Sequence, residues 1–142
     1  MDIAYLVTPL VTWVLVGPIK FLINSVRTRQ WAFGLVGNGG FPSNHSAVVS
    51  SMATLIALRE GIGSPAFGVA VTLAFIVIID ANSLRQHVGK QAAAINRLAQ
   101  ENASPKHHWL RERMGHTLVE IGGGLCTGVA IAFLINSVLG RG

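Results

Sequence analysis

The 142-residue chain is too short for two independent cores, and 51% of its residues are hydrophobic while only 12% are charged. Soluble domains carry about 25% charged residues, so this composition, with a mean hydropathy of +0.52, excludes an ordinary soluble domain and predicts one membrane-embedded domain over residues 1–142. The formal charge is +5, but the cations fall between apolar segments, which argues against nucleic-acid binding and favours anionic head groups or a phosphorylated ligand.

The first apolar segment runs from Ile3 to Ile19 and is long enough to span a membrane if its helix continues to Ser25. It has neither a basic leader nor a small-residue cleavage site, so we expect a retained transmembrane helix rather than a signal peptide. Lys20 and Arg27 fall near its end. They are either interfacial anchors or ligands of an anion.

The second segment opens with the stretch Phe41-Pro42-Ser43-Asn44-His45-Ser46, around which the candidate site is organised. Proline suits the first turn of a helix and serine caps it, so the sequence predicts a helix from Pro42 to about Leu58. The amides of such a first turn form an anion site, with His45 beside it. The alternative for His45 is a capping or interfacial role.

The third segment follows a Gly-Ser-Pro turn, runs from Ala66 to Ile79 and then meets Asp80. Good helix formers continue after it, so we expect helix to about Gln100. A carboxylate at this depth needs a partner. Arg85 and Lys20 are the candidates for pairing with Asp80.

The last part of the chain contains a polar stretch and then a long apolar one. The polar stretch, Glu101 to Met114, is predicted to be a loop followed by a short amphipathic helix, and Thr117 to Leu139 is predicted to span the membrane. Gly124 and Gly128 form a G-x-x-x-G motif, which allows close helix contact either inside the bundle or in a homo-oligomer. The lone cysteine, Cys126, excludes a disulfide framework.

The predicted fold class is therefore all-α: an integral-membrane bundle of about four transmembrane helices plus a short amphipathic helix. Four spans place the polar and charged candidates at the same ends of their helices, on one membrane face. By the positive-inside rule that face is cytoplasmic. The candidates are Lys20, Arg27, Ser43, Asn44, His45, Asp80, Arg85, His116 and Glu120.

His116 and Glu120 are four residues apart and so share one helical face. Glu120 could accept one ring N–H of His116 and leave the other nitrogen as a nucleophile; a purely structural pair is the alternative. His87, His107 and His108 are expected to be solvated or interfacial. A metal site built from the last two and His116 matches no standard ligand spacing.

These residues resemble the superfamily of type-2 phosphatidic acid phosphatases and vanadium haloperoxidases. The resemblance rests on Lys20-x6-Arg27, on Pro42-Ser43-Asn44-His45, and on an arginine and a histidine with an acid four residues later. It is closer to the small divergent bacterial and plastid branch and covers nearly the whole chain. The residues typical of that branch are Gly40-Phe41-Pro42-Ser43-Asn44-His45-Ser46, Asp80-Ala81…Arg85…Gly89-Lys90-Gln91-Ala92 and Gly115-His116-Thr117…Glu120.

The resemblance implies a helical bundle that hydrolyses phosphomonoesters or diphosphates through a phosphohistidine, without metal or cofactor. It implies that His116 is the nucleophile, His45 the acid and Glu120 the partner that orients His116. The phosphate ligands would be Lys20, Arg27 and Arg85, with Ser43 and the Asn44 amide.

The chain departs from the superfamily in the spacing of its last motif. The superfamily places the nucleophile six residues after the last arginine, and here that position is Gln91. We therefore expect a motif split by an insertion between Arg85 and His116. Arg111 and Arg113, just before His116, are alternative candidates for the last arginine.

The favoured function is hydrolysis of a lipid phosphate of the phosphatidate, phosphatidylglycerophosphate or polyprenyl diphosphate class, in a bacterial inner membrane or a plastid-type membrane. The alternative is a non-catalytic membrane protein that binds an anionic lipid or carries a small anion. Both functions would use the same cations, and only the enzyme needs a nucleophilic His116.

Overall fold

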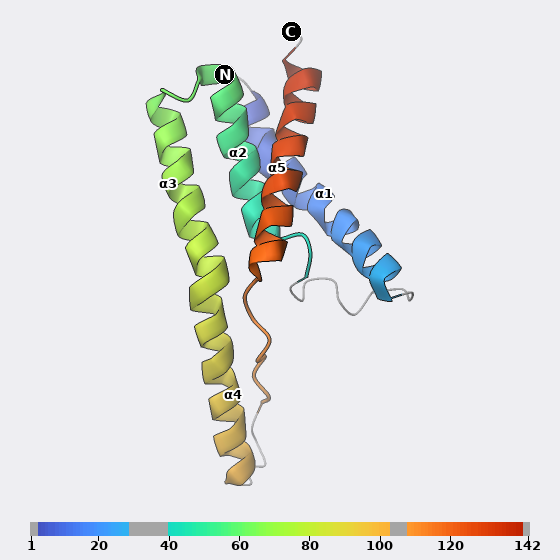
Figure 1. Ribbon diagram of the computed structural model, residues 1–142, viewed down its shortest axis with the longest axis vertical. Coiled ribbons are helices and arrows are strands. Elements are labelled where there is room, and N and C mark those ends of the chain that lie inside the picture. The colour runs from blue at the N-terminus through green and yellow to red at the C-terminus, as the bar shows by residue number, and fades with distance from the viewer. Residues whose placement is uncertain (1–2, 29–39, 103–107, 141–142) are drawn as a thin grey trace.

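The computed structural model describes residues 3–28, 40–102 and 108–140, except for the side chains of Arg27 and Thr28. Within these ranges the chain is helical and contains no strand (Figure 1). The elements in chain order are α1 (Ile3–Thr28), α2 (Asn44–Glu60), α3 (Pro65–Ile79), the π-helical turn η2 (Asp80–Leu84), α4 (Arg85–Glu101) and α5 (Leu118–Leu139).

The starts of α2 and α3 follow from their capping serines. Ser43 has an extended backbone and its hydroxyl accepts a hydrogen bond from the amide of Ser46, so α2 begins at Asn44. The expectation that Pro42 opens this helix is wrong, because the proline precedes the cap. Ser64 caps α3, and Pro65 occupies its first turn, as proline does where no amide partner is lost.

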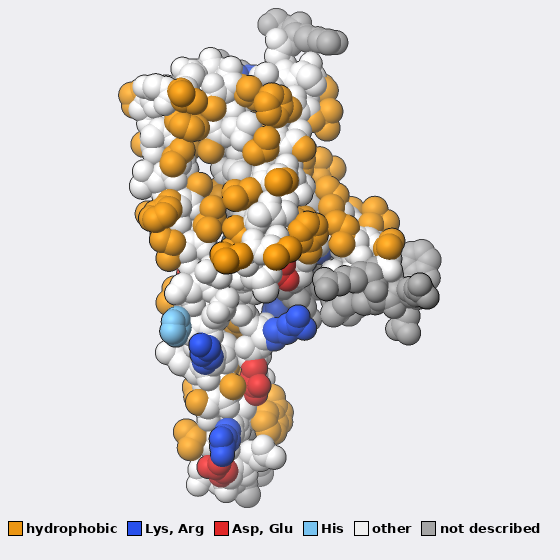
Figure 2. All heavy atoms as spheres, in the orientation of Figure 1, with side chains coloured by type: hydrophobic (Ala, Val, Ile, Leu, Met, Phe, Trp, Pro, Cys, Tyr) orange, Lys and Arg blue, Asp and Glu red, His pale blue; other side chains and the backbone are white. Residues whose placement is uncertain are grey.

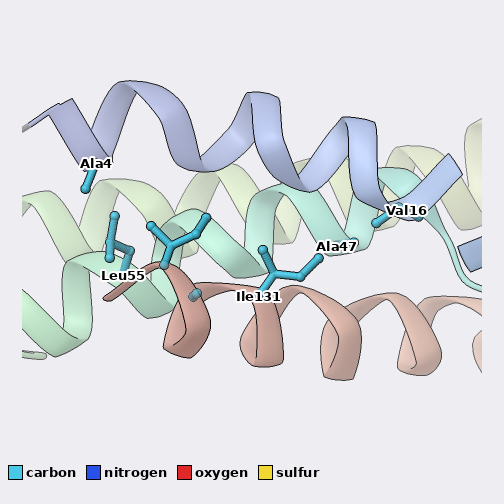
Figure 3. Packing of buried hydrophobic residues seen from close by; sticks show 7 residues of the cluster. Ala4, Val16, Ala47, Leu55 and Ile131 are labelled. Carbon is cyan, nitrogen blue, oxygen red and sulfur yellow. The ribbon is translucent and has the colours of Figure 1, made fainter. Parts of the chain in front are cut away.

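Helix α2 is the centre of the bundle, with α1, α3 and α5 packed around it (Figure 1). The buried apolar core lies where α1, α2 and α5 meet, as Figure 3 shows for Leu55, Ile131 and Ala47. Thr12 Oγ1 on α1 lies 2.8 Å from the carbonyl oxygen of Thr8 and 2.9 Å from Ser51 Oγ on α2, within hydrogen-bond distance of both. These polar side chains between α1 and α2 are therefore hydrogen-bonded, as a low-dielectric interior favours.

Gly124 and Gly128 allow α5 to lie directly against α2. A Cβ at Gly124 would collide with the carbonyl oxygen of Ser43, and one at Gly128 would collide with Ser50 and the Ala47 carbonyl. Both glycines are buried inside the chain. The G-x-x-x-G motif is thus used for packing within the bundle, which is one of the two uses that the sequence left open, and a homo-oligomer contact through these residues stays a prediction.

Among the described residues, three helices are long and apolar enough to cross a membrane: Ile3–Val26, Pro65–Glu101 and Leu118–Leu139. The second of these is α3, η2 and α4 read as one continuous 37-residue helix. The 17-residue α2 is shorter than these three. The predicted all-α membrane bundle is confirmed, with three of its helices reaching full spanning length. Figure 2 shows apolar side chains over the upper part of one face and charged ones below, where α4 extends beyond the bundle.

The predicted short amphipathic helix before Met114 is not present in the described part of that stretch. Residues 108–117 are non-helical and run back along α4 toward the bundle. The polar helix of this region is α4 itself, with Gly89, Ala92 and Asn96 buried on one side. The returning segment packs along that side in a non-helical conformation, where Asn96 hydrogen-bonds to it.

Candidate functional site

The turn η2 joins α3 to α4 and carries Asp80 at its start. Arg85, directly after the turn, donates its Nε–H to Asp80 Oδ2 at 3.2 Å, so the predicted pairing of these two residues is confirmed. Single π turns inside helices are frequent at functional sites. Here the turn brings the carboxylate and the guanidinium together at the end of the bundle.

The returning segment 108–117 is fixed to α4 by Asn96. This buried side chain donates to the Leu110 carbonyl and to the Glu112 carboxylate, both at 2.8 Å, and accepts from the Leu110 amide at 2.9 Å. Gly89 lies on the same side of α4 as Asn96, closer to the bundle. It leaves room for the Glu112 carbonyl oxygen, with which a Cβ at this position would collide. Asn96 and Gly89 together hold the segment against the helix.

The returning segment ends by placing His116 beside η2. The His116 amide donates to the Ala81 carbonyl at 2.9 Å, and Gln86 Nε2 donates to the His116 carbonyl at 3.4 Å. Gly115 has a φ of +89°, and a Cβ there would lie 2.8 Å from Gln86 Cγ. A glycine is therefore needed at this position on both steric and conformational grounds. The insertion after Arg85 brings His116 back to the Arg85 end of α4 rather than carrying it away.

Glu120 links His116 to the start of α5. Its Oε2 lies 3.3 Å from His116 Nδ1 and accepts the Thr117 amide at 2.9 Å, while Thr117 Oγ1 accepts the Glu120 amide. This is a capping box, so the sequence that starts α5 also fixes the carboxylate. The Glu120 carbonyl accepts the Ser43 amide at 2.9 Å, which joins this helix start to that of α2.

A cavity of about 120 Å³ lies where these elements meet. Four of its lining residues carry cationic or imidazole side chains from α1, α2, α4 and the returning segment, and His116 adds a fifth. Asn44 and His45 bring the N-terminus of α2 to the same cavity, where the helix dipole favours an anion. The lining residues are Lys20, Asn44, His45, Arg85, Arg111, Met114, Gly115 and His116.

The two histidine rings of the cavity lie 5.8 Å apart between centroids and are tilted by 58°. His45 Nδ1 and Asn44 Oδ1 are buried and have no hydrogen-bond partner among the described residues. Buried polar atoms without partners are uncommon and are often found at functional sites. The start of α2 therefore offers the cavity two buried polar atoms that have no hydrogen-bond partner among the described residues.

Burial lowers the pKa of His116 from its ordinary value, and the nearby cations Lys20 and Arg85 act in the same direction. The hydrogen bond and charge of Glu120 raise this pKa, but burial is the largest contribution. The imidazole is therefore neutral near neutral pH. With Nδ1–H donated to the Glu120 carboxylate, the lone pair is on Nε2.

The structure thus brings together His116, Glu120, His45, Lys20, Asn44, Arg85, Asp80 and Arg111 from the sequence-predicted set. The others lie elsewhere. The Ser43 side chain is fully buried under the cavity, with its hydroxyl bonded to Ser46, while Arg113, Gln91, His87 and His108 are exposed and do not line it. Arg27 is in α1 with its side chain outside the described part, and His107 lies outside the described residues altogether.

Sequence reasoning missed Met114 and Gly115 in the cavity wall, and Asn96 and Gly89 beneath the returning segment. The glycine before His116 was a usable signal, because it precedes a helix cap and permits a positive φ. No local sequence pattern identifies Asn96 as the residue that holds the returning segment. The described residues also contain no cluster of three or more His, Cys, Asp or Glu side chains suited to a metal ion.

Comparison with known proteins identifies the family of the chain. Residues 1–131 match the model of the Divergent PAP2 family. The chain belongs to this family. It is 31% identical over 132 residues to the uncharacterized membrane protein YuiD of Bacillus subtilis (strain 168), covering 83% of this chain and 82% of that protein. No solved structure matches the chain significantly. As a Divergent PAP2 protein it is a helical membrane protein related to the type-2 phosphatases, so the superfamily relationship expected from the motifs is confirmed.

Proposed function

We propose that this Divergent PAP2 protein is a membrane phosphatase that hydrolyses a lipid phosphate through a phosphohistidine at His116, with the site facing the cytoplasm. The observation that carries the proposal is the position of His116. It lies in a cavity with Lys20, Arg85 and Arg111, and Glu120 is bonded to its Nδ1. A neutral, oriented imidazole among three cations suits nucleophilic attack on phosphorus.

In the first step Nε2 of His116 attacks phosphorus and the bond from phosphorus to the ester oxygen breaks. His45, on the same cavity and in its imidazolium form, donates its proton to the departing alkoxide. Burial, with the charges of Arg85 and His116, lowers the pKa of His45, so only a fraction of the protein carries this form at neutral pH. Glu120 stabilises the cationic ring through the Nδ1–H, and the guanidinium and ammonium groups neutralise charge on the equatorial oxygens. The products are the alcohol and an enzyme phosphorylated on His116.

In the second step water attacks the phosphohistidine. His45, now neutral, accepts a proton from that water, and the bond from phosphorus to Nε2 breaks to release inorganic phosphate. Both histidines return to their starting protonation states, so the cycle balances with one water consumed. Charge for transition-state stabilisation comes from side chains and from the α2 N-terminus, in agreement with the electrostatic character of phosphoryl transfer.

The test is phosphate release by the purified protein from phosphatidate, phosphatidylglycerophosphate and polyprenyl diphosphate in detergent. His116→Ala should abolish release and remove the acid-labile phosphoenzyme, whereas His87→Ala, on the exposed face of α4, should leave both unchanged. Binding of these lipids without release by the parent protein would overturn the enzyme in favour of an anion-binding protein.

A further inference from the structure

A second hollow adjoins the cavity on its membrane side. It has a volume of about 440 Å³ and lies over α2 between α1 and α3, both of which pack on α2. We call it the α1–α3 groove. Its lining residues are Trp13, Asn44, His45, Val48, Val49 and Val77.

The groove and the phosphate cavity share Asn44 and His45. On the cavity side of these two residues lie Lys20 and Arg85; on the groove side the other four lining residues are apolar. The wall therefore changes from cationic to apolar across the first turn of α2. An amphipathic ligand with an anionic head and a hydrocarbon tail is complementary to this change.

We propose that the α1–α3 groove holds the hydrocarbon chain of the substrate, so that the ester oxygen lies at His45 and the chain runs from there toward Val77 and Trp13. This inference rests on the proposed function and adds to it the path of the leaving group. The established family relationship does not assign this groove.

Phosphoryl transfer places the attacking and leaving atoms roughly in line on opposite sides of phosphorus. With His116 as the attacking group, the leaving oxygen points away from it. His45, as the acid, must lie within hydrogen-bond reach of that oxygen. Since His45 also lines the groove, a chain attached to the leaving oxygen begins where the groove begins.

The depth of the groove suits a lipid that stays in the bilayer. Trp13 precedes Lys20 by seven positions on α1, which corresponds to about 10 Å along a helix axis. Val48 and Val49 lie one turn after His45 on α2, further from the N-terminus of that helix. The groove therefore runs from the cavity toward the middle of the Ile3–Val26 span, and the phosphate reaches the cations without the chain leaving the apolar region.

A matched control exists on the other face of α3. There a hollow of about 560 Å³ is lined by Pro65, Gly68, Val69, Thr72, Leu73 and Ile76, and it shares no residue with the phosphate cavity. Its lining side chains are also mostly apolar. A substitution in it tests whether any added bulk on α3 affects the protein.

The first experiment measures kcat/KM for a long-chain lipid phosphate and for a short-chain, water-soluble one. Val48→Trp and Val77→Trp should each lower the long-to-short ratio by roughly 10- to 100-fold, since filling a hydrophobic pocket discriminates on that scale. Val69→Trp should leave both rates at their parent values. A ratio unchanged in both groove variants, with the variants folded and active, would overturn the proposal.

The second experiment does not depend on turnover. With Trp31 and Trp109 replaced by phenylalanine, Trp13 reports on the groove through its fluorescence. A lipid phosphate brominated on its chain should quench Trp13 more than a similarly brominated phosphatidylcholine at equal mole fraction, and Lys20→Ala should remove the excess.

The two readouts separate the inference from the function beneath it. Excess quenching without phosphate release would support binding of the lipid chain in the α1–α3 groove and would reject the proposed hydrolysis. Equal quenching by both lipids means that bulk bilayer lipid fills the groove and rejects the inference, whatever the protein hydrolyses.

Discussion

The backbone amide of His116 donates a hydrogen bond to the carbonyl oxygen of Ala81, with 2.9 Å between nitrogen and oxygen. This one contact ties the residue before the Thr117 cap of α5 to the π turn before Arg85. It explains how a motif interrupted by a helix and a returning segment still places its arginine and its histidine on one cavity.

Substitution of His45 and substitution of His116 should reduce the rate of hydrolysis in different ways. His45→Ala should slow release of a glycerol-type alkoxide by roughly 10²–10⁴-fold, because general acid catalysis contributes on that scale. It should slow release of p-nitrophenolate far less, since that leaving group needs little protonation. His116→Ala should abolish both reactions. Steady-state rates on the two substrates check this, and equal losses for both leaving groups in His45→Ala would remove His45 as the acid.

Orthovanadate should bind the cavity, because its trigonal bipyramid resembles the phosphoryl-transfer transition state. Lys20→Ala and Arg111→Ala should weaken binding by roughly 10- to 100-fold each, as each removes a charge-assisted hydrogen bond. Titration calorimetry in detergent measures the dissociation constants.

Arg113→Ala is the matched control for vanadate binding, since this arginine is exposed and does not line the cavity. It should bind vanadate as the parent does. A larger loss of vanadate affinity in Arg113→Ala than in Arg111→Ala would show that Arg113, rather than Arg111, is the third cation of the phosphate site beside Lys20 and Arg85.

The acidic limb of the kcat/KM profile should report the pKa of His116, which must be neutral to attack. Burial lowers this pKa, so activity should persist below pH 6.5, the ordinary histidine value. Glu120 favours the protonated ring, so Glu120→Gln should move the limb to still lower pH while reducing the plateau. Lys20 opposes protonation, so Lys20→Ala should move the limb upward. Shifts of the opposite sign in this pair would exclude His116 as the titrating group.

Asn96 should act on phosphate affinity from outside the cavity, since it holds the segment that carries Arg111. Asn96→Ala should raise KM and the vanadate dissociation constant more than it lowers kcat. Combining it with Arg111→Ala should add little further loss, because both changes remove the same contact. Gln91→Ala, an exposed position on the same helix, should change neither constant. Full additivity of the double variant would indicate that Asn96 serves only folding.

The packing of α5 on α2 should be sensitive to single methyl groups. Gly124→Ala should destabilise the protein by about 1–3 kcal/mol, as overpacking does, because the new Cβ collides with the Ser43 carbonyl. Gly122→Ala has nothing within 4 Å of its Cβ and should be neutral or slightly stabilising. Thermal unfolding in detergent measures both. A change in oligomeric state without loss of stability in Gly124→Ala would indicate instead that Gly124 lies in an oligomer interface.

The sequence by itself determined the class of protein, most helix limits and the family. A long apolar segment that crosses a membrane must satisfy its backbone hydrogen bonds within itself, which favours a helix. The capping side chains Ser43, Ser64 and Thr117 bond amides within three residues of themselves. The approximate end of α4 was also predictable, since helix formers continue past Asp80. These features depend on local chemistry, so they can be recognised without knowing the fold.

The tertiary structure alone decided which residues share the cavity. The choice of Arg111 over Arg113 depends on an irregular segment whose path is set by hydrogen bonds to Asn96, far away in sequence. The inward use of Gly124, and the burial of Ser43 beneath the cavity, follow from the contact between α2 and α5. Spacing cannot reveal such contacts, because the partner of each group lies on another helix and its distance is fixed only when the helices pack.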